Sequence, residues 1–212
     1  MIGRLIAREV RRGLTGAAWL PVAFFMLVTT IVPFAVGPDA RLLARIGGGA
    51  LWIAALTAAL LPVERLIEPD RADGVLDQLS LTGASEEAVG AAKMIGHWLT
   101  FGPLLLIAAV PGSFLVGLDG PALARSLFSL AIGTPALAAL AVAVAALTAG
   151  LPRAGAMAGL LMMPLAVPLV IFGAAASGDA DSSALRLEAA VALLLIAGAP
   201  FVTAAAIRAG RT

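Results

Sequence analysis

The feature that most constrains this chain is a series of six long apolar runs, at about 17–37, 42–62, 94–117, 126–150, 155–177 and 187–207. Each is long enough to cross the hydrocarbon core of a bilayer as a helix, which takes about 20 residues. The runs are nearly free of charge, and Arg45 stands close enough to an end for its side chain to reach the interface. Charged residues make up 13% of the 212-residue chain, roughly half the share of a soluble domain. We therefore predict an all-α integral membrane protein with a single six-helix transmembrane domain over residues 1–212.

The basic residues of the loops orient these helices, because Lys and Arg accumulate on the cytoplasmic side of a membrane. With the N-terminus inside, the other side holds four basic residues: Arg41, Arg45, Arg125 and Arg186. The cytoplasmic segments then hold ten: Arg4, Arg8, Arg11, Arg12, Arg65, Arg71, Lys93, Arg153, Arg208 and Arg211. Both termini are therefore predicted to be cytoplasmic. We interpret the first run as a span and not a signal peptide, since it is longer than a signal peptide's apolar region and no clear A-x-A site follows.

Residues 2–14, IGRLIAREVRRGL, form a separate element ahead of the first span. Apolar side chains recur on one helical face, at Ile2, Leu5, Ile6, Val10 and Leu14, while Arg4, Arg8 and Arg11 share another. The pattern predicts an amphipathic helix on the inner leaflet, with its arginines near anionic headgroups. The alternative is a basic tail that only orients the first span.

The loop of residues 64–93, between the second and third spans, is polar yet patterned. Its stretch DGVLDQL predicts a short amphipathic helix, because Val75, Leu76 and Leu79 fall on one helical face. The Thr-Gly pair that follows should end this helix. Ser85 and the two acids after it should begin the next, since serine caps exposed amides and acids complement the positive helix end. That second helix is expected to continue into the third span.

The charge of this loop is strongly negative. It carries three bases, Arg65, Arg71 and Lys93, against seven acids: Glu64, Glu68, Asp70, Asp73, Asp77, Glu86 and Glu87. The resulting net charge of −4 suits a cytoplasmic partner with a basic groove, and the apolar face of Val75, Leu76 and Leu79 would supply the buried contact. The loop is therefore interpreted as a docking element. The alternative is a solvated connector, which would be shorter and less patterned.

No catalytic or metal-binding motif is found along the chain. The single lysine, Lys93, stands in AAKMI without the glycine-rich turn of a nucleotide-binding P-loop, and neither H-E-x-x-H nor G-x-S-x-G occurs. There is no cysteine, which excludes disulfides, thiolate metal sites and thioether attachment of haem through this chain. We therefore expect no enzyme activity, no catalytic residue and no metal, and any ATP must act through another chain.

Longer strings in the sequence resemble a known family. IEPDRADGVLDQLSLTGASEEAVGAAKMIGHW is similar to the cytoplasmic loop and third helix of CcmB, the membrane subunit of the haem exporter-like ABC complex of cytochrome c maturation. VPFAVGPDARLLARIGGGALWIAALTAALLPVERL resembles its segment from the end of the first helix through the outer loop and the second helix. LAIGTPALAALAVAVAALTAGL resembles its fourth helix and MMPLAVPLVIFGAAA its fifth. The resemblance covers almost the whole chain. The shorter pattern D-G-x-L-[DE]-Q-L is shared with the wider group of ABC-2 type permeases.

The resemblance implies a permease subunit of the bacterial inner membrane, paired with a cytoplasmic ATPase (CcmA-like) that binds the ATP. It also implies CcmC-like and CcmD-like membrane partners, a second copy of this chain, and an indirect link to the haem chaperone CcmE. No cofactor is expected to be bound tightly, and haem is the candidate substrate, with its passage through this chain left open. The ATPase-coupling residues would be Asp73, Gly74, Val75, Leu76, Asp77, Gln78 and Leu79. One departure is that this chain has Thr82, Gly83 and Ala84 where prolines are common in the family, which leaves the form of that turn open.

His97, the single histidine, lies in GHWLTF near the start of the third span. An ionisable side chain within a span is a candidate functional group, and a neutral imidazole can ligate haem iron. The alternative is an interfacial hydrogen bond beside Trp98, which suits an aromatic belt.

Three functions therefore remain open from the sequence. The chain could serve as the membrane subunit of a haem exporter driven by a separate ATPase. It could be a non-transporting scaffold whose motion releases the haem-loaded chaperone. It could also be an ABC-2 exporter of another hydrophobic substrate.

Overall fold

The computed structural model describes residues 2–15, 19–178 and 182–211. Within these ranges the chain forms helices and no strand: α1 (Ile2–Thr15), α2 (Trp19–Val36), α3 (Ala40–Leu60), α4 (Glu64–Ala72), α5 (Val75–Leu81), α6 (Glu86–Leu115), α7 (Gly120–Thr148), α8 (Ala154–Gly178) and α9 (Ser182–Ala209). Six of them, α2, α3, α6, α7, α8 and α9, are long and apolar enough to cross a membrane. The predicted all-α class with six spanning helices is confirmed.

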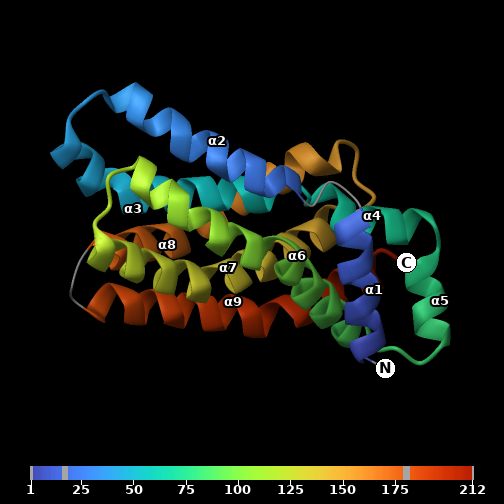
Figure 1. Ribbon diagram of the computed structural model, residues 1–212. Coiled ribbons are helices and arrows are strands. Elements are labelled where there is room, and N and C mark those ends of the chain that lie inside the picture. The colour runs from blue at the N-terminus through green and yellow to red at the C-terminus, as the bar shows by residue number, and fades with distance from the viewer. Residues whose placement is uncertain (1, 16–18, 179–181, 212) are drawn as a thin grey trace.

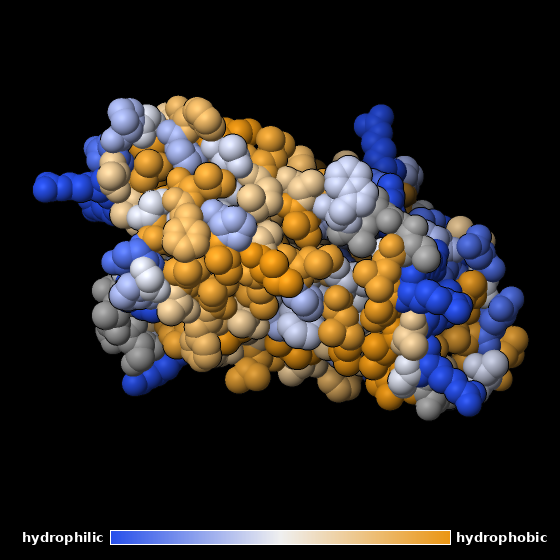
Figure 2. Space-filling model, in the orientation of Figure 1, coloured by the Kyte–Doolittle hydropathy of each residue, from blue (hydrophilic) through white to orange (hydrophobic). Residues whose placement is uncertain are grey.

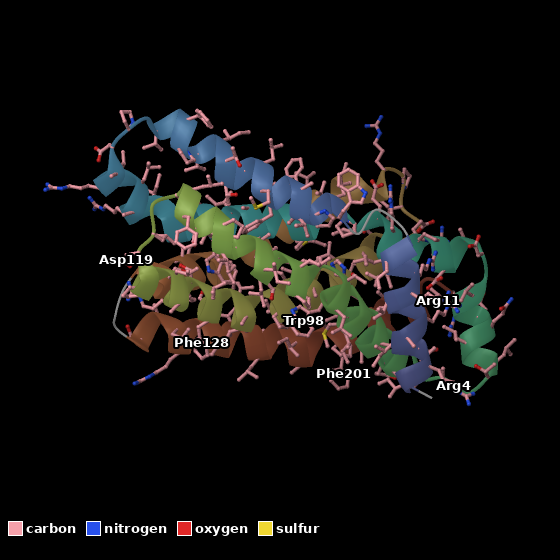
Figure 3. All side chains as sticks on the ribbon, viewed as in Figure 1. Arg4, Arg11, Trp98, Asp119, Phe128 and Phe201 are labelled. Atoms are coloured by element: carbon pink, nitrogen blue, oxygen red, sulfur yellow. The ribbon has the colours of Figure 1, made fainter. Side chains whose placement is uncertain are left out.

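The six long helices run side by side along one axis, and α1 crosses them at one end (Figure 1). The short helices α4 and α5 and both chain termini lie at this same end. We call it the polar end, made of residues 2–15, 64–88 and 208–211. Figure 3 places Arg4 and Arg11 on α1 at the polar end and Asp119 at the opposite end of the bundle.

Helix α7 forms the centre of the bundle. It packs against α6, α8 and α9 and also contacts α3 and α4. Its second half is largely alanine and valine, and residues 136–146 are buried throughout. Small side chains allow neighbouring helices to approach closely, which is how helices associate where no hydrophobic effect draws them together.

Two glycines hold the indole of Trp52 between α7 and α8. A Cβ atom at Gly133 of α7 or at Gly173 of α8 would overlap with the Trp52 ring. Trp52 is fully buried, and its Nε1 donates a hydrogen bond of 2.9 Å to Ser129 Oγ. This large side chain of α3 therefore depends on the absence of side chains at both facing positions.

Polar residues at the helix starts set where several helices begin. Asp39 Oδ1 accepts hydrogen bonds from the backbone amides of Arg41 and Leu42, and Asp119 Oδ1 accepts one from Ala122. Ser85 Oγ accepts a bond of 3.2 Å from the Ala88 amide, so the predicted start of α6 at Ser85 is confirmed. From there α6 continues without a break to Leu115.

The hydropathy of the surface differs between the middle and the two ends of the bundle. Figure 2 shows a broad apolar belt over the middle of the molecule, with hydrophilic side chains gathered at the two ends. Large exposed apolar side chains such as Phe34, Phe128, Leu194 and Phe201 belong to the spanning helices. A surface of this kind fits a lipid environment, in which apolar side chains face outward at no cost.

Candidate functional site

The turn between α4 and α5 depends on Gly74. Its backbone has a φ of 69°, in the left-handed region that glycine adopts without the steric penalty of a side chain. The Gly74 amide donates to the Arg71 carbonyl at 3.1 Å, which closes α4. The Asp-Gly pair of the sequence motif therefore lets the chain turn sharply into α5.

The turn after α5 is a Schellman motif, a common way for a helix to end on a left-handed glycine. Gly83 has a φ of 80°, its amide donates to the Ser80 carbonyl at 2.9 Å, and the Ala84 amide donates to the Leu79 carbonyl at 3.1 Å. The Thr-Gly-Ala sequence thus ends the helix through glycine, which settles the form of the turn that the sequence left open.

The two faces of α5 lie differently from the docking hypothesis. Leu76 is 7% exposed and belongs to the hydrophobic core, and Leu79 packs against that core. Two of the three apolar residues expected to contact a partner therefore pack inside this chain, and the third, Val75, is half-buried. Leu81, which is 89% exposed, and the exposed Asp77 and Gln78 form the outer face instead. A helix this short buries its apolar side first against its own bundle.

Arg211, just beyond α9, binds α5 to the rest of the polar end. Its Nη2 donates to the Leu76 carbonyl at 3.0 Å and its Nε to Asp77 Oδ1 at 3.0 Å. Its Nη1 donates to Glu86 Oε1, at the start of α6, at 2.6 Å. One turn earlier, Arg208 pairs with Glu87 at 2.8 Å. The C-terminal end of α9 thus contacts both α5 and α6.

These ion pairs correct the reading of the loop charge. Asp77, Glu86 and Glu87 pair with Arg208 and Arg211 of the C-terminal segment. Glu68 pairs with Arg71, and its Oε2 also accepts a hydrogen bond from the Gly150 amide at 2.7 Å. Most of the loop's negative charge is therefore compensated within this chain, so the net charge of −4 does not describe the surface that a partner meets.

A buried ion cluster joins α1, α4 and α6. Asp70 is 1% exposed and Lys93 is 3% exposed, and the two are in direct contact. Arg8 Nη2 donates to Asp70 Oδ1 at 2.8 Å, Arg12 also binds Asp70, and Lys93 Nζ donates to Glu9 Oε2 at 3.2 Å. The hydrogen bond to Asp70 raises the pKa of Arg8 above its ordinary value. Arg8 and Arg12 of α1 thus turn toward the protein, whereas the sequence had placed Arg8 on the face near headgroups.

His97 lies one turn beyond Lys93 on α6. It is 6% exposed, its ring centroid is 4.7 Å from that of Phe101, and its Nε2 has no hydrogen-bond partner among the described residues. The neighbouring Trp98, which the sequence suggested for an aromatic belt at the interface, donates a hydrogen bond from Nε1 to Thr134 Oγ1 of α7, at 3.1 Å. No group of three or more potential metal-ligating side chains was found in the described part of the chain.

A second buried polar group lies toward the far end of the bundle. Glu188 of α9 is completely buried, and its Oε2 is 2.8 Å from Ser129 Oγ, which also lies 3.1 Å from the Gly173 carbonyl oxygen. Because Ser129 also accepts from Trp52, this network connects α3, α7, α8 and α9. Sequence reasoning treated these spans as nearly uncharged and overlooked Glu188. The available signal was a single carboxyl inside an apolar run, which marks a residue that faces the bundle interior.

The cluster around Asp70 was missed for a different reason. Asp70 and Lys93 were counted only as loop charges, and their separation by 23 positions gives no periodic signal. The available hint was a lone lysine flanked by apolar residues at the start of a span, since a buried cation needs an acid partner.

Six apolar helices, with a short helical segment held at one end by ion pairs, define a multi-pass α-helical membrane protein. The model of the CcmB protein family matches residues 1–210 of the chain. The chain therefore belongs to the CcmB family.

Individual relatives match over nearly their full length, and each bears the name heme exporter protein B. The protein of Paracoccus denitrificans is 43% identical over 212 residues, covering 96% of this chain and 97% of its own length. That of Rhodobacter capsulatus is 42% identical over 211 residues, with the same coverage. That of Escherichia coli strain K12 is 40% identical over 216 residues and covers 98% of both chains.

Proposed function

We propose that this chain is the membrane subunit of a haem-exporting ABC complex of the bacterial inner membrane, acting in cytochrome c biogenesis. ATP is hydrolysed by a separate cytoplasmic ATPase subunit. Its motion drives either the export of haem or the release of a haem-loaded periplasmic chaperone. The family membership and the names of the relatives support the haem-related role.

The observation that carries the coupling proposal is the position of α5. Helix α5 lies outside the long helices at the polar end (Figure 1). The Leu81 side chain is exposed to solvent, and Arg211 links α5 to α9. An ATPase that moves α5 would therefore move the C-terminal end of a spanning helix with it. We propose Asp77, Gln78 and Leu81 as the contact face, and Gly74, Leu76 and Leu79 as residues that position it.

Lys93 supports the assignment of ATP to another chain. A nucleotide-binding lysine must offer its ammonium to phosphates. Lys93 Nζ donates to Asp70, to Glu9 Oε2 and to the Leu66 carbonyl, at 2.8 Å for the last. An ammonium has three hydrogens, so these contacts use its full donor capacity.

The packing of α7 favours the second form of the proposal, in which no substrate passes through this chain. Residues 136–146 of α7 are buried by neighbouring helices with no side chain larger than leucine. A haem path through the middle of this bundle would have to separate these close contacts. A haem path at an interface with a CcmC-like subunit or a second copy would leave these contacts in place. Mechanical release of the chaperone would leave them in place as well.

His97 is the residue of this chain that we propose as a haem contact. Its buried Nε2 has no partner in the described residues, and neutral imidazole is a common haem ligand. We expect His97→Ala to reduce cytochrome c maturation in cells, while His97→Ala protein still accumulates in the membrane. Unchanged maturation would remove His97 from the haem path and leave the coupling proposal intact.

Co-purification tests the ATPase contact. We expect Leu81→Asp to weaken the complex with the cytoplasmic ATPase. We also expect the ATP-dependent release of the haem-loaded chaperone by that complex to be reduced. Leu42→Asp is the matched control, because Leu42 is also exposed but lies at the far end of the bundle. If Leu81→Asp protein bound the ATPase as well as the wild type, α5 would not be the docking surface.

A further inference from the structure

A cleft opens at the polar end between α1, α4 and α6. Its walls include Arg12, Pro21, Arg65, Leu66, His97 and Phe101, and it has a cavity volume of about 240 Å³. Sites that enclose a drug-sized ligand usually have about 300–1,000 Å³. The cleft is therefore suited to one end of a larger molecule, with the remainder outside it.

The charges around the cleft leave an excess of positive charge. In the buried cluster, the ion pairs among the described residues join three bases, Arg8, Arg12 and Lys93, to two acids, Glu9 and Asp70. Arg65 adds a further positive charge, because it is exposed and forms no ion pair within the residues that the structure describes. The walls of the cleft therefore attract an anion.

The same walls are apolar where they face the bundle. Phe101 is 2% exposed, Leu66 packs against the hydrophobic core, and Pro21 at the start of α2 is buried. Beside them the buried His97 offers an unpartnered ring nitrogen, Nε2. A small soluble anion would gain nothing from these apolar walls. A molecule with both an acid group and an apolar body would use both parts.

We propose that this cleft binds the acidic end of an anionic amphiphile, with its phosphate or carboxylate at Arg65 and its apolar part against Phe101 and Leu66. Two sources have this chemistry. One is an anionic phospholipid, since basic pockets between helices at the cytoplasmic side bind such headgroups. The other is haem, an apolar macrocycle with carboxylates. The haem source rests on the proposed function and the phospholipid source does not.

Binding to the purified full-length chain, without any ATPase, tests this site. Phosphatidylglycerol, zwitterionic phosphatidylcholine and haem are titrated separately, and bound ligand is counted by native mass spectrometry. We expect phosphatidylglycerol or haem to bind more tightly than phosphatidylcholine. Arg65→Gln should weaken that binding about tenfold, as expected when one charge-assisted hydrogen bond is lost. Arg153→Gln is the matched control: it removes one exposed arginine predicted on the same side that does not line the cleft.

Each outcome decides the proposal. Binding of phosphatidylglycerol that depends on Arg65 supports the site with a lipid as its occupant. Binding of haem that depends on Arg65 and resists phosphatidylglycerol supports it with haem. Equal binding by wild type and Arg65→Gln, or an equal loss in Arg153→Gln, overturns it. A chain that binds the amphiphile normally but does not bind the ATPase would contradict the proposed function alone.

Discussion

Asp70 and Lys93 form the buried ion pair on which the packing of α1, α4 and α6 most depends. Both are almost fully buried, and ions removed from water are stable only with close partners. Asp70 supplies that partner for Lys93, Arg8 and Arg12 together. One carboxylate thus holds α1 and α6 against α4.

We predict that Asp70→Asn lowers the free energy of unfolding by about 3–5 kcal/mol, because it leaves the buried Lys93 without its main counter-charge. The measurement is denaturant unfolding of the purified protein in detergent. Glu68→Gln is the control, since the Glu68–Arg71 pair is exposed and its loss should change stability much less. An equal loss of unfolding free energy in Asp70→Asn and Glu68→Gln would show that the buried cluster stabilises the protein no more than an exposed ion pair does.

The glycines around Trp52 form the second critical point at this scale. We predict that Gly133→Ala and Gly173→Ala each destabilise the bundle by about 1–3 kcal/mol, because the added methyl group would overlap with the indole ring. Gly159→Ala is the matched control, since nothing lies within 4 Å of its Cβ position. Thermal unfolding in detergent measures all three. A loss of stability in Gly159→Ala as large as in the other two would contradict this explanation.

At the scale of the element, α5 is too short to be stable alone. Isolated helices below about 12–15 residues are marginal in water, and α5 has 7 residues. Its stability comes from the burial of Leu76, from the glycine turns at both ends and from Arg211. A helix held by so few contacts can be displaced by a partner without unfolding the spans.

We predict that Arg211→Gln speeds amide hydrogen exchange in residues 75–81 and leaves exchange in the middle of α7 unchanged. The reason is that Arg211 binds both the Leu76 carbonyl and Asp77, and so holds α5 against α9. Arg153→Gln serves as the control, because that exposed arginine lies at another turn. Hydrogen–deuterium exchange read by mass spectrometry gives the comparison. Unchanged exchange in α5 would mean that Arg211 does not hold it.

At the scale of the whole molecule, the polar end contains both termini together with α1, α4 and α5 (Figure 1). The count of basic residues predicts that this end faces the cytoplasm. The chain has no cysteine, so a single introduced thiol can report on which side a position lies.

We predict that a membrane-impermeant thiol reagent labels Pro38→Cys in spheroplasts and labels Thr82→Cys only after the membrane is opened. Both positions are exposed, and they lie at opposite ends of the bundle. The extent of labelling is read by the mass added to the purified protein. The reverse pattern would invert the orientation and place α5 out of reach of a cytoplasmic ATPase.

The sequence by itself determined the class of protein, the six spans, the end of α5 and the start of α6. These depend on local signals: about 20 consecutive apolar residues for a span, a serine cap for the start of a helix, and a Thr-Gly pair for the end of one. Only the tertiary structure decided which loop charges form ion pairs within the chain, which side of α5 faces outward, and that Ser129 donates a hydrogen bond to Glu188. Those contacts join residues between 23 and 135 positions apart, and no local pattern records a pairing that forms only when the helices pack.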